Sequence, residues 1–125
     1  MMEKMKKNYK KWLFILILVV FFIGCQSTKL KDTVNEKVNN NTYSVIYNDL
    51  NNLINEINMF PTRENEEEFI YYVIAIKENY NKFTSDELNS ISNLLNFDYK
   101  FGFNKLDYDI NDFSNDKQII NSYIN

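Results

Sequence analysis

The sequence predicts a small α+β domain in which three to four helices dominate and a β-hairpin lies in the C-terminal half of the chain. Two observations predict this fold class. Apolar residues recur at helical spacing from residue 43 to residue 95, and they then alternate with polar residues from Phe97 to Ile110. If the alternating stretch does not pair as strands, the alternative fold is an all-α bundle.

The clearest helix is expected at residues 43–60, where apolar residues follow the i, i+3, i+4, i+7 pattern. Pro61 ends this helix, because proline has no N–H to donate and its ring disturbs the preceding turn. The other face is rich in asparagine, a modest helix former, so packing has to supply the stability. The apolar face consists of Tyr43, Ile46, Tyr47, Leu50, Leu53, Ile54, Ile57 and Phe60.

A second helix is expected to begin after Thr62, which is a suitable N-cap residue. The apolar run at residues 69–76 is compatible with a buried strand as well as with a helix. The acidic start and the helical spacing that continues through Tyr80 favour a helix packed on two sides. We interpret the glutamates of the start as a solvated first turn, where the helix dipole favours anions: Glu64, Glu66, Glu67 and Glu68.

The third helix has the strongest local signal. The sequence from Thr84 to Glu87 matches a capping box, and Phe83 can pack on Leu88 as a hydrophobic staple. The alternating residues that follow predict two short strands joined by a turn at residues 104–105. A lone hairpin is marginally stable in water, so its aromatic face is expected to pack on the helices. A short terminal helix is expected at residues 112–125.

The first 27 residues indicate where the protein is located. Five lysines among the first eleven residues precede an apolar run from Trp12 to Ile23. A spanning helix needs about 20 apolar residues, so this run is short for one and has the size of the apolar region of a signal peptide. The run ends at Gly24 and Cys25, the only cysteine. The segment resembles the signal peptide of bacterial lipoproteins, with Phe22-Ile23-Gly24-Cys25 as the lipobox.

This resemblance implies cleavage between Gly24 and Cys25 and attachment of a diacylglycerol to the Cys25 sulfur. Acyl chains contribute about 0.8 kcal/mol per buried CH2, so two or three of them hold a protein stably on a bilayer. The expected location is the bacterial cell envelope. Because Gln26 is not aspartate, the resemblance implies the outer membrane in a cell with two membranes, and otherwise the outer face of the plasma membrane. The alternatives are an uncleaved membrane anchor and a cytosolic protein.

Residues 25–41 are polar and lack apolar periodicity, which predicts an acylated cysteine and a polar tether before a single small domain at residues 42–125. Without residues 1–24, the chain has nine basic and sixteen acidic residues and a formal charge of −7. Nucleic acid is therefore excluded as a partner, because its phosphates select basic surfaces. Anionic lipid headgroups are repelled as well, so the acyl chains have to hold the protein on the membrane.

The composition also excludes several kinds of chemistry. The chain has no histidine, which is the usual general base near neutral pH and the commonest zinc ligand. Its two glycines, Gly24 and Gly102, cannot build a phosphate-binding loop. Acylation of Cys25 leaves no thiol. No serine, threonine or lysine is placed beside a suitable base, so we expect no enzyme activity and no cofactor.

A weak cation site is one candidate binding site. Asp107, Asp109 and Asn111 match positions 1, 3 and 5 of an EF-hand loop, but Asp112 replaces the required glycine and Gln118 replaces the bidentate glutamate. A solvated strand face with a helix cap is the other interpretation of these residues.

An aromatic surface is the other candidate. Aromatic side chains are enriched at protein interfaces, but they also dominate small cores, and both interpretations remain open. The sequence therefore predicts a non-catalytic envelope lipoprotein that contacts a protein or the cell wall, with a small-ligand or weak cation-binding lipoprotein as the alternative. The candidate partner surface consists of Tyr71, Tyr72, Tyr99, Phe101 and Phe103.

Overall fold

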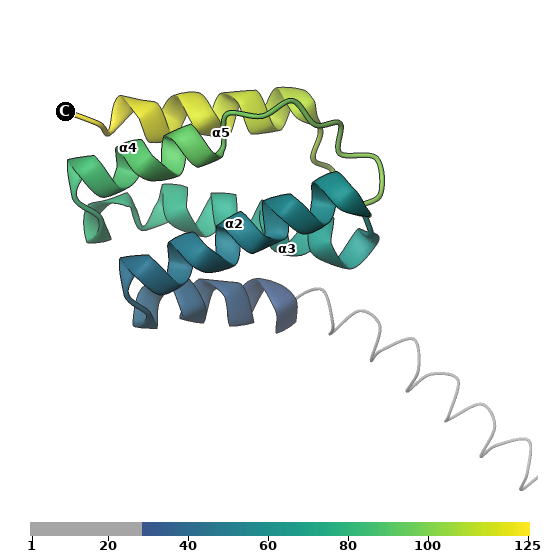
Figure 1. Cartoon of the computed structure of the whole chain (residues 1–125), viewed down its shortest axis with the longest axis horizontal. Coiled ribbons are helices and arrows are strands. Elements are labelled where there is room, and N and C mark those ends of the chain that lie inside the picture. The colour runs from purple at the N-terminus through teal and green to yellow at the C-terminus, as the bar shows by residue number, and fades with distance from the viewer. Residues whose placement is uncertain (1–28) are drawn as a thin grey trace, which may run out of the picture. The chain divides into compact units, whose positions relative to one another are not determined.

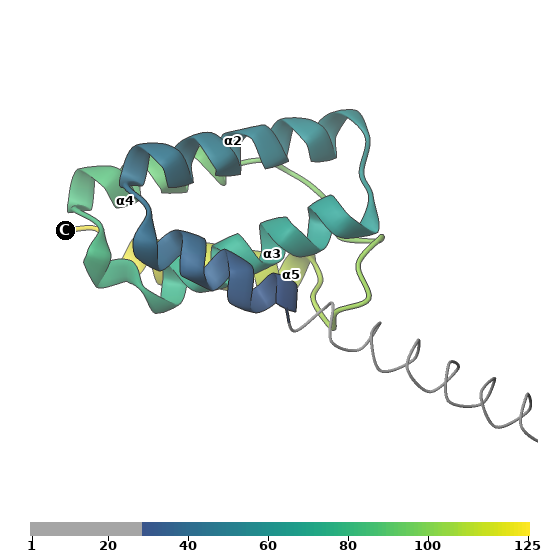
Figure 2. The same ribbon diagram turned by 90° about the horizontal axis from the view of Figure 1, so that it is seen from below.

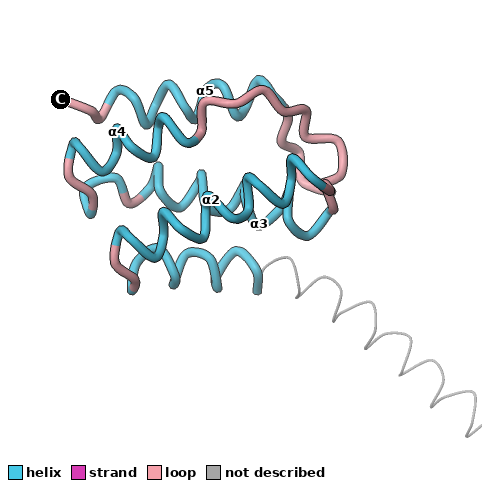
Figure 3. The backbone as a smooth tube through the Cα atoms, in the orientation of Figure 1, coloured by secondary structure: helices cyan, strands magenta, loops and turns pink. Residues whose placement is uncertain are grey.

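The computed structural model describes residues 29–125, which are helices joined by short turns and one long loop (Figures 1 and 3). The chain divides into two compact units, Met1–Asp32 and Thr33–Asn125. Of the first unit, residues 29–32 are described, and they are helical. The second unit forms the helical domain. It contains helical residues 33–40, α2 (Tyr43–Met59), α3 (Arg63–Glu78), the 3-10 turn η1 (Tyr80–Lys82), α4 (Ser85–Leu94) and α5 (Ile110–Ser122).

Four helices of this domain pack in a ring. Helix α2 contacts α3, α3 contacts α5, α5 contacts α4, and α4 contacts α2. Figures 1 and 2 show these helices side by side along the long direction of the domain. Their apolar faces turn inward, as the helical spacing predicts. The largest fully buried apolar side chains are Tyr72, Phe69, Phe113, Ile46, Leu50, Ile57, Ile70, Ile76, Ile91, Leu95 and Ile120.

Helix α3 has more buried residues than α2, α4 or α5, and the helical interpretation of residues 69–76 is confirmed. Its Phe69 ring lies 5.6 Å from the ring of Phe97, 5.9 Å from Phe101 and 5.6 Å from Phe113. Tyr72 is fully buried and donates a hydrogen bond to Asp49 of α2 over 3.2 Å. A helix surrounded by other elements needs apolar residues on most of its sides, which explains why the run shows no single apolar stripe.

The predicted β-hairpin is wrong. Residues 29–125 contain no strand and are 73% helical, so the domain is all-helical in its described part, as in the alternative fold. Residues 95–109 form a loop between α4 and α5. The alternating pattern arises because Phe97 and Phe101 direct their rings onto Phe69, while polar neighbours face away. Three backbone N–H groups of this loop, those of Phe103, Asn104 and Lys105, find acceptors in α3 side chains rather than in a second strand.

The domain also includes residues that the sequence assigns to a tether. Val34 and Val38 have no exposed surface, and Lys82 donates hydrogen bonds to the backbone carbonyls of Val38 and, over 2.8 Å, of Asn41. The stretch differs from the expectation because two valines four residues apart make only a narrow apolar stripe. Such a stripe does not stand out among asparagines and lysines.

Candidate functional site

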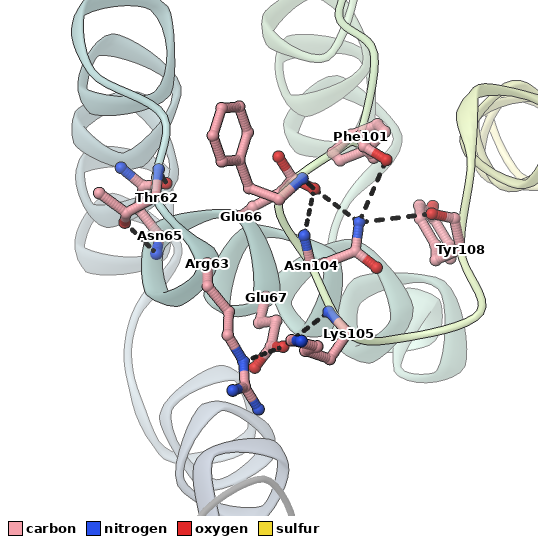
Figure 4. A network of polar contacts seen from close by, with 10 residues as sticks. Thr62, Arg63, Asn65, Glu66, Glu67, Phe101, Asn104, Lys105 and Tyr108 are labelled. Carbon is pink, nitrogen blue, oxygen red and sulfur yellow. Dashed lines mark hydrogen bonds and ion pairs between the residues drawn. The ribbon is translucent and has the colours of Figure 1, made fainter.

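The turn between α2 and α3 is held in one conformation by a capping box. The Asn65 N–H donates to Thr62 Oγ1 over 3.1 Å, and the Thr62 N–H donates to Asn65 Oδ1 over 2.8 Å. Asn65 is itself buried, and its Nδ2 donates to the backbone carbonyl of Phe60 over 3.0 Å. Figure 4 shows Thr62 and Asn65 facing each other at the start of α3. The backbone on both sides of Pro61 is therefore well ordered.

This ordered turn presents two large apolar side chains to solvent. Met59 is 85% exposed and Phe60 is 75% exposed, the highest values among the exposed large apolar residues of the described chain. Phe60 belongs to the predicted apolar stripe of α2, but it follows the last helical residue and its side chain leaves the core. Exposed apolar side chains that lie together commonly mark an interaction site.

A groove runs beside these two side chains. It has a volume of about 420 Å³ and lies between the end of α2 and the start of α3. We call this surface the α2–α3 corner, and it is formed by Glu56, Met59, Phe60, Thr62, Glu64, Asn65 and Glu68. It contains three carboxylates and no basic side chain.

The carboxylates of the corner repel one another. Burial raises the pKa of Glu68 above its ordinary value of 4.5; Lys37 opposes this effect, and the negative charges of Glu56, Asp49 and Glu64 add to it. The Lys37 ammonium lies 3.9 Å from the Glu68 carboxylate, at the outer limit of an ion pair. Arg63, the nearest basic residue in sequence, bonds instead to Glu67 over 3.0 Å. The negative charge of the corner is thus only weakly compensated.

The adjoining face of α3 anchors the long loop. Glu66 is fully buried, and its Oε1 accepts hydrogen bonds from the Phe103 N–H (3.0 Å), the Asn104 N–H (2.9 Å) and Asn104 Nδ2 (2.5 Å). Its Oε2 accepts a bond from the Tyr99 hydroxyl over 2.7 Å. Figure 4 shows the Asn104 side chain lying against Glu66. Four donors thus replace the water that a carboxylate normally requires.

Glu67 adds a second point of attachment. It is 4% exposed, and besides Arg63 it accepts a bond from the Lys105 N–H over 3.1 Å. Consecutive residues of α3 therefore hold consecutive residues of the loop. The prediction that Glu66 and Glu67 form a solvated helix start is wrong, because the loop covers them.

Most of the predicted aromatic surface lies in the core. Tyr72 is fully buried, Tyr71 is 8% exposed and Phe101 is 9% exposed. Tyr99 is half-buried, with its hydroxyl on Glu66. Phe103 alone of the five is well exposed, at 54%, and its backbone is bonded to Glu66. The structure therefore brings Phe103 to the same end of α3 as the corner and keeps Tyr71, Tyr72 and Phe101 inside.

The predicted cation ligands serve a helix start. Asp109 is the N-cap of α5 and accepts bonds from the Asn111 N–H (2.9 Å) and the Asp112 N–H (3.0 Å). The backbone hydrogen bond from Asp112 lowers the pKa of Asp109. Asn111 is part of the helix and Asp107 is exposed. Among residues 29–125, no group of three or more metal-ligating side chains comes together.

A second hollow, of about 470 Å³, lies between α4 and α5 and is polar. It combines serine and lysine side chains. The Ser92 hydroxyl donates a hydrogen bond to the Asn121 side-chain oxygen, and the Lys117 ammonium lies 4.4 Å from the centre of the Phe113 ring. Neither contact activates a nucleophile, because a nucleophile needs an adjacent base. Its lining residues are Ser92, Asn93, Asn96, Ser114, Lys117, Gln118 and Asn121.

Gly24 and Cys25, the predicted cleavage and lipidation residues, lie outside the described residues, as does the apolar run before them. Over residues 29–125, no helix has the combination of length and apolar character that is needed to cross a bilayer.

Two parts of the site were not predicted, Glu66 and the pair of Met59 and Phe60, and each has a signal in the sequence. Glu66 precedes Phe69, Ile70 and Val73 by three, four and seven residues, so it lies on the same side of α3 as these buried residues. Met59 and Phe60 stand directly before Pro61, where the helix ends and its apolar face no longer faces the core.

No protein-family model matches this chain, and no curated protein and no solved structure is measurably similar to it.

Proposed function

We propose that this chain is a bacterial envelope lipoprotein, held on a bilayer by acylated Cys25, whose helical domain binds another macromolecule without catalysing a reaction. The Gly24-Cys25 pair after a basic lead and a short apolar run supports the anchor. The exposed side chains of Met59 and Phe60 support the binding role, and they are the observation that carries it.

Two features suit this surface for binding. Burying a large apolar side chain is worth about 1.5–3 kcal/mol, so covering Met59 and Phe60 contributes substantially to the free energy of association. The bonds from Asn65 already hold the turn, so a partner does not have to order it, and a pre-ordered surface loses less entropy on binding.

The anchor is tested by Cys25→Ser in bacterial cells that express the chain. We expect the wild-type chain to be clipped at its front end, to gain mass from acyl groups and to sediment with membranes. Cys25→Ser should lose the clipping and the acyl mass. A variant that is clipped as before, or a wild-type chain that carries no acyl group, would contradict the lipoprotein proposal.

The binding role is tested by photo-crosslinking in intact cells, with benzoylphenylalanine in place of Phe60. The matched control places it at Val45, which is 42% exposed near the other end of α2. We expect a discrete crosslinked species from position 60 and none of the same mass from position 45. Identical patterns from both positions, or no crosslink from either, would overturn the binding role.

A further inference from the structure

We propose that the α2–α3 corner binds a cationic peptide segment of a protein partner. An apolar residue of that segment would cover Met59 and Phe60, and its lysine or arginine side chains would pair with Glu56, Glu64 and Glu68. This inference rests on the proposed binding function and deepens it by naming the chemistry of the partner.

The charge of the corner favours this partner. The groove has three carboxylates and no basic side chain in its lining. Two basic side chains lie near the corner. Arg63 bonds to Glu67, which does not line the groove, and the Lys37 ammonium lies 3.9 Å from the Glu68 carboxylate. A partner with positive charge would therefore meet a negative surface that Lys37 compensates only weakly, and such complementarity raises association rates and selects the partner.

The repulsion among the carboxylates is a second argument. Glu68 is partly buried beside like charges, an arrangement that lowers the stability of the free domain. Proteins commonly retain destabilising arrangements where a binding function needs them. A cationic segment would relieve this repulsion on binding, so the free energy lost in the unbound domain would be recovered in the complex.

Other occupants fit the corner less well. Nucleic acid and anionic lipid headgroups would face three carboxylates, which repel phosphate groups. A second copy of the chain, paired through the same surface, would place the carboxylates of one corner against those of the other. In the described part of the chain, no set of three metal-ligating side chains converges here to hold a divalent cation.

The apolar side chains distinguish this surface from an ordinary acidic patch. Surface ion pairs alone are worth about 0–1 kcal/mol each and are screened by salt. Met59 and Phe60 provide the area that a partner can dehydrate, and the carboxylates around them then act at shorter range and lower dielectric. We therefore expect binding to require both an apolar anchor and positive charge in the same segment.

The test uses the full acylated chain in nanodiscs of phosphatidylcholine, a lipid without net charge. The probe is the fluorescently labelled peptide Arg-Lys-Phe-Lys-Arg. Its binding is measured by fluorescence anisotropy, and nanodiscs without the protein are the control. Two matched peptides replace either the phenylalanine with serine or all basic residues with glutamate. We expect measurable binding of the first peptide, at least tenfold weaker binding of the serine peptide, and no binding of the acidic one.

Two sets of variants separate local from general charge effects. Neutralising the corner with Glu56→Gln, Glu64→Gln and Glu68→Gln should weaken peptide binding at least tenfold. The control set, Glu36→Gln, Glu78→Gln and Asp98→Asn, removes the same charge from exposed positions away from the corner and should change binding less than threefold. Met59→Ser with Phe60→Ser should abolish it.

The inference would be overturned if the two sets of charge variants lost equal peptide affinity, or if the acidic peptide bound as tightly as the basic one. Full peptide affinity in the variant with Met59→Ser and Phe60→Ser would also overturn it. Selective binding of phosphatidylglycerol vesicles or dimerisation through the corner would overturn it as well. The proposed function is distinguishable from it: a crosslink from position 60 that survives the corner charge set supports a binding surface but rejects a cationic partner.

Discussion

The strongest structural prediction concerns Glu66. Replacing Glu66 with alanine removes the acceptor of four hydrogen bonds and leaves the donors of Tyr99, Phe103 and Asn104 without it. Each buried polar group left unsatisfied costs about 1–3 kcal/mol. Because part of the loop can open to water, we expect Glu66→Ala to lower the free energy of unfolding by about 3 kcal/mol or more. A domain of this size has about 5–15 kcal/mol in total.

Glu66→Gln is a more conservative test of the same contacts. The glutamine oxygen can keep the three bonds made by Phe103 and Asn104, and the Tyr99 hydroxyl can rotate to accept from the new amide. These bonds lose their charge assistance, while the domain no longer has to dehydrate a carboxylate. We expect a loss of about 1–2 kcal/mol, between the alanine variant and the wild type.

Both variants are measured by urea unfolding of the detergent-solubilised full chain, followed by far-ultraviolet circular dichroism. Hydrogen exchange should show that the amides of Phe103 and Asn104 lose protection before the core helices do. The matched control is Glu64→Ala, an exposed carboxylate in the same turn, which should cost less than about 1 kcal/mol. If Glu66→Ala costs no more than this control, or if the two amides stay protected, the account of the loop is refuted.

Three further predictions concern stability. Glu68→Gln should stabilise the domain at pH 7 by less than about 1 kcal/mol. Because the pKa of the Glu68 carboxyl is raised in the folded domain, the stability of the wild type falls as the pH rises through that pKa. Thermal melts should therefore show the gain at pH 7 and none below pH 4.5. Lys77→Met leaves Asp116, 6% exposed, without the cation that lies 2.9 Å away, and should cost about 2–4 kcal/mol in urea unfolding; a loss below 1 kcal/mol would show that the pair is not buried in solution. Val38→Ala should cost about 1–3 kcal/mol if residues 33–40 belong to the domain, whereas a tether would tolerate it without change in the melting temperature.

Helices α2, α3 and α4 were predicted correctly from local signals in the sequence. The predictions that failed concern segments whose structure depends on contacts between residues far apart in the sequence. The capping boxes at Thr62 and Thr84 and the stop at Pro61 involve residues within a few positions of each other. The stretch from Phe97 to Ile110, most of which lies in the loop between α4 and α5, was predicted as strands, because alternation of apolar residues is typical of a half-buried strand. Alternation requires only that alternate side chains be more buried than their neighbours. The loop meets this requirement at Phe97, Tyr99 and Phe101, whereas Phe103 is 54% exposed.

The candidate site was predictable only in part. Phe103 was among the predicted surface aromatics and is exposed, whereas Tyr71, Tyr72 and Phe101 lie in the core. Composition alone cannot separate these outcomes, because aromatic residues serve cores and interfaces alike. The α2–α3 corner was not predicted, since its groove is formed only when the end of one helix turns back against the start of the next.

The sequence by itself determined where α2, α3 and α4 begin and end along the chain, because the spacing of apolar residues, the capping residues and a proline act over a few residues. It also determined the acidic character of the domain and the lipoprotein-like start of the chain, which is still a prediction. Only the tertiary structure decided that Glu66 is buried, since its hydrogen-bond donors come from positions 33 to 38 residues further along the chain. The helical spacing of Glu66 indicates that it can face the core, but a carboxylate enters a core only where the fold brings hydrogen-bond donors to it, and local sequence does not show which donors those are.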